Sequence, residues 1–308
     1  RIAREQIALA LRELGAAARP PASAVHASRK ALKRLRALIV AVQPGIGKAA
    51  ARDYDRRIKG LARVLSARRD ADVSLETVAA LEARYGEGAR MALLALRLHL
   101  EEVRTAAHSG LDPAAVADIC ASLKLLDEEI AARTWAGESF SDVVAGVTKI
   151  YRRGRALAAK AFASPTDECV HDLRKAVQAH WRHMGLLSRA WPELFAARAA
   201  TARNLSHILG EDHDLALLVS AAKSLGKGER KAVAKLCRRR QKALRRAAEP
   251  LAARLYAEPA GNFGRRLATY WNAAQKMSPA DPDDVGTGAY GGTEEPRARQ
   301  RVAAKTSD

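Results

Sequence analysis

The residues best suited to chemistry begin with a histidine that is followed, at helical spacing, by a row of cations. His26 opens this row, and the cations after it are Arg29, Lys30, Lys33, Arg34 and Arg36. At about 100° of rotation per residue these side chains gather on one half of a helix, and the apolar residues between Leu32 and Val42 occupy the other half. Arg and Lys donate several hydrogen bonds to phosphate oxygens, so this face suits a polyanion. A solvated cationic surface is the alternative.

A weaker copy of the same row follows 145 residues later, where residues 170–176 repeat the pattern of residues 25–31. The copy keeps His171, Arg174, Lys175 and Arg182. A second match, in nearly the same register, pairs residues 65–70 with residues 209–214. Two matches in register predict a tandem of two helical halves, near 1–136 and 137–277, each about the size of a four-helix bundle.

His26 and His171 each sit within a cationic row. Repulsion from the neighbouring cations should lower the pKa of both imidazoles, and a bound polyanion should raise it. A phosphate oxygen could accept a hydrogen bond from either ring.

Metal binding is a weaker alternative use of histidine in this chain. His180 and His183 have HxxH spacing, and His207 and His213 lie near Asp212 and Asp214. No set of three ligands with a familiar spacing is present, so we expect neither a metal nor another cofactor.

Two further rows of cations and a pair of acids could extend the site. The rows are Lys149, Arg152, Arg153 and Lys160 within 140–162, and Lys231, Lys235, Arg238, Lys242 and Arg245 within 228–257. The second row could equally be a solvated surface. Asp70 and Asp214 recur at matching repeat positions, which would suit acid–base work, although a helix cap or a salt bridge to a nearby Arg is the simpler interpretation.

Composition limits the fold to helices and the partner to an anion. The chain has 308 residues and a formal net charge of +19, and it is poor in Gly, Pro and aromatic residues. The remainder is rich in Ala, Leu and Arg, which favour helices over strands, so an all-α fold is predicted. Apolar runs are far shorter than the ~18 residues of a membrane span. Three cysteines without CxxC spacing suit a reduced cytoplasm.

Apolar periodicity predicts a helix in nearly every segment up to residue 277. The predicted helices are 2–18, 22–42, 48–66, 70–84, 88–108, 113–135, 140–162, 166–190, 193–209, 212–224, 228–257 and 261–276. Residues 278–308 lack this periodicity, contain more acids than bases and are predicted to be a disordered tail. The chain starts with Arg1 rather than Met and shows no signal peptide, so we expect residues upstream of it.

The pattern from His26 to Arg36, its copy from His171, and the pairs Arg69-Asp70 and His213-Asp214 resemble the conserved histidine α-helical domain family, CHAD. Residues 150–155 also look like the segment that opens the second half of that family. The resemblance covers most of residues 1–277. It implies two pseudo-symmetric four-helix bundles around a basic groove or pore that binds inorganic polyphosphate.

The resemblance also implies site residues, a partner and a location. The implied polyphosphate-binding residues are His26, Arg29, Lys30, Lys33, Arg34, Arg36, Arg69, Lys149, Arg152, Arg153, Arg155, His171, Arg174, Lys175 and Arg182. A triphosphate-tunnel (CYTH) domain is an expected neighbour, and polyphosphate granules are an expected location.

Common enzyme motifs, among them GxxxxGK[ST], GxSxG and HExxH, do not occur in the sequence. We therefore expect binding without catalysis. Two alternatives stay open: a nucleic-acid-binding helical protein, and a phosphoanhydride-processing enzyme in which Asp70 and Asp214 hold a divalent ion.

Overall fold

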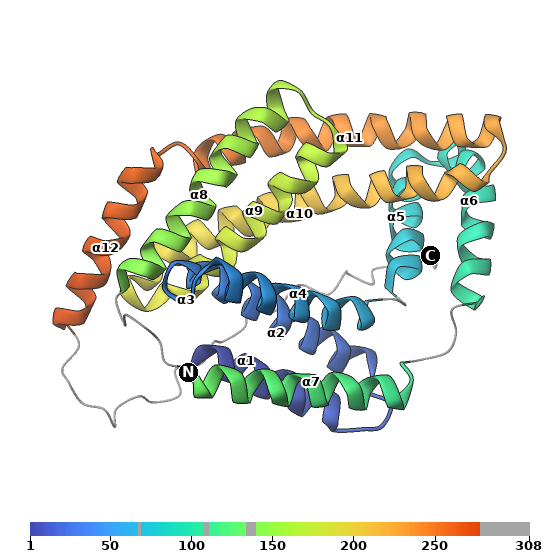
Figure 1. Ribbon diagram of the computed structural model, residues 1–308. Coiled ribbons are helices and arrows are strands. Elements are labelled where there is room, and N and C mark those ends of the chain that lie inside the picture. The colour runs from blue at the N-terminus through green and yellow to red at the C-terminus, as the bar shows by residue number, and fades with distance from the viewer. Residues whose placement is uncertain (67–68, 107–110, 134–139, 278–308) are drawn as a thin grey trace, which may run out of the picture.

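The protein is built from α-helices, and the described residues contain no strand. The computed structural model describes residues 1–66, 69–106, 111–133 and 140–277 (Figure 1). The predicted disordered tail, 278–308, lies outside the described residues. The prediction of an all-α fold is confirmed.

The helices follow the predicted segments closely. In chain order they are α1 (Ile2–Gly15), α2 (Ala22–Ala41), α3 (Gln43–Ile46), α4 (Lys48–Val64), α5 (Arg69–Tyr85), α6 (Glu87–Ala106), α7 (Pro113–Ala132), α8 (Phe140–Ala163), α9 (Asp167–Leu186), η1 (Ser188–Ala190), α10 (Pro192–Ala221), η2 (Ala222–Ser224), α11 (Lys227–Leu255) and α12 (Ala260–Met277). Among the described helices, none has the length and apolarity needed to cross a membrane.

Helices α1, α2, α4 and α7 share one hydrophobic core. Leu32 and Leu35 on α2 are fully buried in it, together with Ile7 of α1, Ile58 of α4 and Leu123 of α7. The apolar half of α2 is therefore the buried half, as its periodicity predicts, and the cations of α2 are left on the remaining surface.

A second core forms among α8, α9, α10, α11 and α12. Tyr151 of α8 is fully buried against Phe263 of α12, with ring centroids 4.2 Å apart. The Tyr151 hydroxyl donates to the Glu258 carbonyl oxygen at 2.8 Å, so this buried polar group is satisfied.

Helices α5 and α6 pack away from the helices that precede them in the chain. Leu93 and Leu96 of α6 share a third core with Leu218 of α10 and Val233 of α11. Figure 1 shows α5 and α6 beside one end of the long α10–α11 pair, apart from α1 and α7. The prediction of one separate bundle for each half of the chain is not confirmed, because this core joins residues from both halves.

Helix α10 corrects one predicted boundary. The sequence predicts helices over 193–209 and 212–224, whereas α10 continues through Gly210 to Ala221. One Gly inside a helix costs only about 1 kcal/mol relative to Ala, and the buried Leu205, Leu209 and Leu215 anchor the helix on both sides of it. At the matching position of the first repeat, α4 ends at Val64 and α5 begins at Arg69.

Two other predicted boundaries also change. Pro44 and Gly45 lie within the single-turn helix α3, where the sequence predicts only a break. The predicted helix 166–190 ends at Leu186, and the one-turn η1 follows it.

Close contacts hold α2, α8 and α9 together. A Cβ on Gly146 of α8 would overlap the carbonyl group of Ala41, so the two helix backbones approach at a distance only Gly permits. His183 of α9 is fully buried, and its Nε2–H donates to the Ala37 carbonyl of α2 at 2.9 Å. These contacts place the first and second cationic rows side by side.

Candidate functional site

Guanidinium groups from both repeats meet where α2 and α9 pack. Arg182 of α9 lies close to Arg34 and Arg36 of α2 and to Arg174 of its own helix. Burial, followed by repulsion from these three cations, lowers the pKa of Arg182 to about 10. We call Arg34, Arg36, Arg174 and Arg182 the arginine cluster. An anion bound here would relieve the repulsion within the cluster.

Arg182 is held by its own helix and by an aromatic ring. Its Nη1 donates to the Gln178 carbonyl oxygen at 2.8 Å, and its guanidinium carbon lies 5.2 Å from the centre of the Trp181 ring. The guanidinium of Arg203, on α10, lies 5.8 Å from the centre of the same ring. Arg203 therefore adds a further cation next to the cluster.

Arg174 lies between α9 and α10. Burial lowers its pKa, and attraction to Asp214 offsets part of that effect. The Nε atom is buried and has no hydrogen-bond partner among the described residues. A buried donor without an acceptor is costly, and the oxygen of a bound anion would supply the missing acceptor.

Arg36 has two roles in the structure. Its Nε donates to Asp55 Oδ1 at 2.7 Å and its Nη2 to Asp55 Oδ2 at 3.3 Å, which ties α2 to α4. The same guanidinium lowers the pKa of Arg182. The ion pair therefore holds Arg36 in place while its charge still acts on the cluster.

Two histidines stack beside the cluster. The rings of His171 and His213 have centroids 4.2 Å apart and planes inclined by 25°. Burial lowers the pKa of His171, and Lys175 and Arg174 lower it further. Burial, followed by repulsion from His171 and Arg174, lowers the pKa of His213 to about 4. The expected repulsion at His171 is confirmed, although burial is the larger cause.

The remaining predicted residues of α2 line the outer part of its cationic face. His26 and Arg29 are partly buried, whereas Lys30 and Lys33 are exposed. They extend the arginine cluster along α2 towards its first turn. The same helix thus carries partly buried arginines and exposed lysines in one continuous row.

The predicted cations of α8 and α9 do not share a single face. Lys149 donates to Gln43 Oε1 of α3 at 2.7 Å. The hydrogen bond from Lys175 lowers the pKa of Asp172 on α9, and the charge of Arg153 adds to this effect. Lys175 also forms an ion pair with Asp172, at 2.9 Å. Lys149 of α8 therefore faces α3 and Arg153 of α8 faces α9, whereas Lys175 is paired within its own helix, α9.

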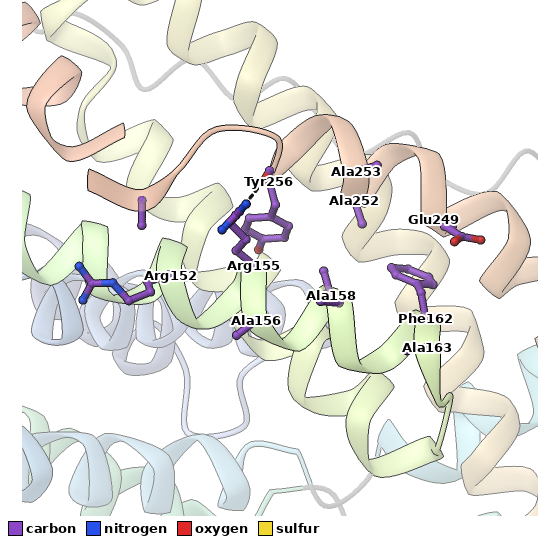
Figure 2. Close-up of a pocket in the computed structure, with 12 residues that line it drawn as sticks. Arg152, Arg155, Ala156, Ala158, Phe162, Ala163, Glu249, Ala252, Ala253 and Tyr256 are labelled. Atoms are coloured by element: carbon purple, nitrogen blue, oxygen red, sulfur yellow. Dashed lines mark hydrogen bonds between the residues drawn. The ribbon is translucent and has the colours of Figure 1, made fainter. Parts of the chain in front are cut away.

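Arg152 and Arg155 instead line a groove between α8 and α11 with a volume of about 690 Å³ (Figure 2). The groove wall is mostly alanine together with Phe162 and Glu249. Arg155 Nε donates to the Tyr256 carbonyl oxygen at 3.1 Å, which turns Arg155 towards α11. The sequence pattern placed Arg152 and Arg153 on one face, but the structure separates them.

Of the two acids at matching repeat positions, Asp70 and Asp214, the structure describes the side chain of Asp214 only. Arg69 begins α5, and the side chains of Arg69 and Asp70 lie outside the described part of the chain. Asp214 acts on Arg174, consistent with an electrostatic partner rather than an isolated acid. The buried Asp212 accepts from Arg245 Nε at 2.8 Å, so this cation of the α11 row is part of the fold.

The HxxH histidines have internal partners. His180 is fully buried, and its Nε2 accepts a hydrogen bond from Arg198 Nε at 3.3 Å, while His183 bonds to α2. Within the described ranges, no three His, Cys, Asp or Glu side chains are close enough to hold a metal ion.

Sequence reasoning missed Arg203 and the partnership of His213 with His171. Arg203 and His213 belong to α10, and they contact side chains of α9. The positions of side chains around a single helix cannot reveal such contacts. The repeat offered one signal, because it placed His213 beside Asp214 in the second matched segment.

The described helices and their cationic rows define an all-α protein with a basic face on α2 and α9. A model of the CHAD domain family matches residues 1–223, more than two thirds of the chain, and the chain belongs to this family. The match ends before α11 and α12, whereas the resemblance in the sequence was expected to cover most of residues 1–277. No curated protein matches the chain.

Proposed function

We propose that the protein binds inorganic polyphosphate along the cationic face of α2 and α9 without catalysing a reaction on it. The arginine cluster carries this proposal. Arg182 retains its charge at neutral pH although burial and three neighbouring guanidiniums oppose it. Membership of the CHAD family is consistent with a role related to polyphosphate.

The chemistry of the face suits a chain of phosphates. Each guanidinium offers a planar fork of donors to phosphate oxygens, and each Lys adds a mobile charge. We assign the inner contacts to Arg34, Arg174 and Arg182, and the outer contacts to Arg29, Lys30 and Lys33. His26 and His171 would each donate one hydrogen bond. In this proposal the two repeats form the walls of one basic groove, and the ligand lies between them.

Aromatic packing favours polyphosphate over single-stranded nucleic acid, whose binding sites add rings on which bases stack. Tyr151 is fully buried. Trp181 is close to two guanidiniums, and Trp271 stacks on Phe140 with ring centroids 4.0 Å apart. These three rings already pack against other parts of the protein.

The test is a binding measurement with size-defined polyphosphate beside single-stranded DNA of equal total charge. We expect polyphosphate to displace DNA at a far lower phosphate concentration than DNA needs to displace polyphosphate. Arg34→Gln should weaken polyphosphate binding at least about tenfold, since a hydrogen bond to a charged group contributes about 1.5–3 kcal/mol. The matched control is Lys235→Gln on the exposed face of α11, which should leave affinity unchanged. Equal displacement by both polymers would favour the nucleic-acid alternative.

The proposed absence of catalysis has its own test. The protein is incubated with polyphosphate and Mg²⁺ or Mn²⁺, and free orthophosphate is measured against a heat-inactivated sample. Release above that control, lost in Asp214→Asn, would favour a phosphoanhydride-processing enzyme.

A CYTH-type partner domain, a cytoplasmic location and association with polyphosphate granules belong to the same proposal. They follow from the family resemblance. Co-purification with a CYTH protein and imaging of the tagged chain in cells that form granules would test them.

A further inference from the structure

A second hollow adjoins the groove between α8 and α11. Its volume is about 400 Å³, and Phe162 and Glu249 line both this hollow and the groove of about 690 Å³. Figure 2 shows the Phe162 ring extending from α8 towards α11, with Glu249 on the facing helix. Hollows of this size between helices are typical sites for small molecules. We call the larger part, with its wall of alanines, the alanine groove, and the smaller part the cationic hollow, after Arg238, Lys242, Arg245 and Arg246.

The turn between α8 and α9 holds the wall of the cationic hollow in place. Arg245 Nη1 donates to the Pro165 carbonyl oxygen at 3.3 Å, and Arg245 Nη2 donates to Asp167 Oδ1 at 2.6 Å. The buried Gln241 donates from Nε2 to the same carboxylate oxygen at 3.2 Å. Two side chains of α11 are therefore bound to this turn, so the hollow is formed before any ligand enters it.

Three other cations of the hollow are not used in this way. Arg238, Lys242 and Arg246 line the hollow and are exposed. Arg245 is paired with two carboxylates, whereas no ion pair within the described ranges involves any of these three side chains. They follow one another at intervals of one turn, about 6 Å along the helix axis, so their long side chains can converge on one run of linked phosphates.

The alanine groove offers a different chemistry. Ala156 and Ala159 of α8 face Ala252 and Ala253 of α11 across it, and these small side chains leave room for a flat ring. Phe162 adds an aromatic side chain at the junction of the two parts, where a nucleic-acid base can pack against it.

Glu249 sets the order of groups along the groove. Its carboxylate lies at the junction, where it can accept hydrogen bonds from sugar hydroxyls. The same negative charge repels phosphates from the alanine groove. The surface therefore changes from apolar, through one carboxylate, to cationic.

We propose that the alanine groove and the cationic hollow together bind a nucleoside triphosphate. The base lies in the alanine groove against Phe162, the ribose hydroxyls donate to Glu249, and the phosphates lie along α11 in the cationic hollow. An inorganic phosphate chain would leave the alanine groove unused. The site lies between α8 and α11, whereas the arginine cluster lies on α2 and α9, so this proposal does not depend on the polyphosphate site.

Photolabelling of the full chain with 8-azidoadenosine triphosphate tests the proposal, because mass spectrometry then locates the labelled residues. We expect label within 156–163 or 249–253. Unmodified ATP should suppress this label at a concentration at least about tenfold lower than tripolyphosphate or adenosine requires, since only ATP uses both parts of the site. Phe162→Leu keeps an apolar side chain at this position and should weaken protection by ATP but not by tripolyphosphate.

A matched pair of charge variants tests the phosphate contacts. Replacing Arg238, Lys242 and Arg246 together by Gln should weaken protection by ATP at least about tenfold. The control replaces Lys227, Lys231 and Lys235 of the same helix by Gln, which removes equal charge from exposed positions outside the hollow. This control and Arg34→Gln should each leave protection by ATP unchanged. Circular dichroism shows whether each variant folds.

Three results would overturn the proposal. Tripolyphosphate that protects as well as ATP would show that the nucleoside makes no contact. Equal losses in the two triple variants would mean that ATP responds to net charge rather than to a site. Loss of label in Arg34→Gln but not in the Arg238, Lys242 and Arg246 variant would place ATP at the arginine cluster.

Discussion

The charge of Arg182 has a cost for the stability of the fold. Its pKa is lowered to about 10, which means that the folded chain holds this positive charge less favourably than the unfolded chain does. The penalty is present at every pH below about 10 and fades as pH rises towards the ordinary value of 12.5. A residue that destabilises the unliganded state in this way points to a ligand that compensates for it.

Arg182→Gln should therefore change the stability of the chain and its affinity for polyphosphate in opposite directions. We expect the free energy of unfolding of the unliganded chain to rise by about 1 kcal/mol, because repulsion lost from the cluster outweighs the lost packing. Polyphosphate affinity should fall about tenfold or more, since a charged donor is lost. Urea unfolding and titration calorimetry measure the two effects. A variant that is less stable but binds normally would make Arg182 a purely structural residue.

The stacked histidines make the unliganded fold sensitive to acid. His213 has a pKa of about 4 in the folded chain, against an ordinary value of 6.5. The stability that neutral His213 contributes is complete above pH 6.5 and is lost progressively as pH falls from 6.5 to about 4. His213→Gln should remove this contribution, which we expect to be about 1–2 kcal/mol after allowance for partial exposure.

The measurement is urea unfolding at a series of pH values. The difference in unfolding free energy between the unaltered chain and His213→Gln should shrink as pH falls through this range. The buried His180 and His183 titrate in both proteins and cancel in the comparison. A difference that is constant with pH would show that His213 titrates normally in the folded chain.

At the scale of the element, apolar periodicity predicts where the helices lie but not how they pair. The face of α2 is predicted correctly, because the buried Leu32 and Leu35 and the cations opposite them follow from rotation about one helix. The proximity of Arg34 on α2 to Arg182 on α9 is only suggested by the sequence repeat. The contact of His171 with His213 depends on how α9 and α10 pack against each other. The sequence of one helix does not determine that packing.

The same limit explains the differences in the fold. Gly210 is typical of a break, but buried leucines on both sides hold α10 together. Helices α5 and α6 belong to the first repeat by sequence, yet their buried leucines pack on α10 and α11. The sequences of α5 and α6 cannot specify whether these helices pack on the first or the second repeat, since either repeat could offer an apolar surface of similar composition.

The crossing of α8 and α2 depends on Gly146. Gly146→Ala should lower the unfolding free energy by about 1–3 kcal/mol, because the added Cβ overlaps the backbone of Ala41 and forces the helices apart. Gly60→Ala on α4 is the matched control, since its added Cβ would meet nothing within 4 Å. This control should raise stability by up to about 1 kcal/mol through helix propensity alone. Thermal unfolding of both variants measures the effects, and equal shifts would mean that the crossing is not tight.

For the whole molecule, the positive charge is a source of both repulsion and attraction. The net charge is +19, and part of it is concentrated in the arginine cluster. Salt screens the repulsion among these cations in the free protein. It also weakens the attraction of a polyanion, because fewer counterions are released on binding when the salt concentration is high. The two effects of salt should therefore have opposite signs.

Added NaCl should raise the melting temperature of the unliganded chain and lower its affinity for polyphosphate. We expect log affinity to fall linearly with log salt concentration, with a slope that grows with the number of phosphates neutralised. Arg182→Gln should reduce both responses, since it removes one cation from the cluster, whereas Lys235→Gln should change neither slope measurably. Differential scanning calorimetry and binding titrations over one set of salt concentrations provide the data. If affinity were independent of salt while the melting temperature still rose, the repulsion would be real but the ligand would bind elsewhere.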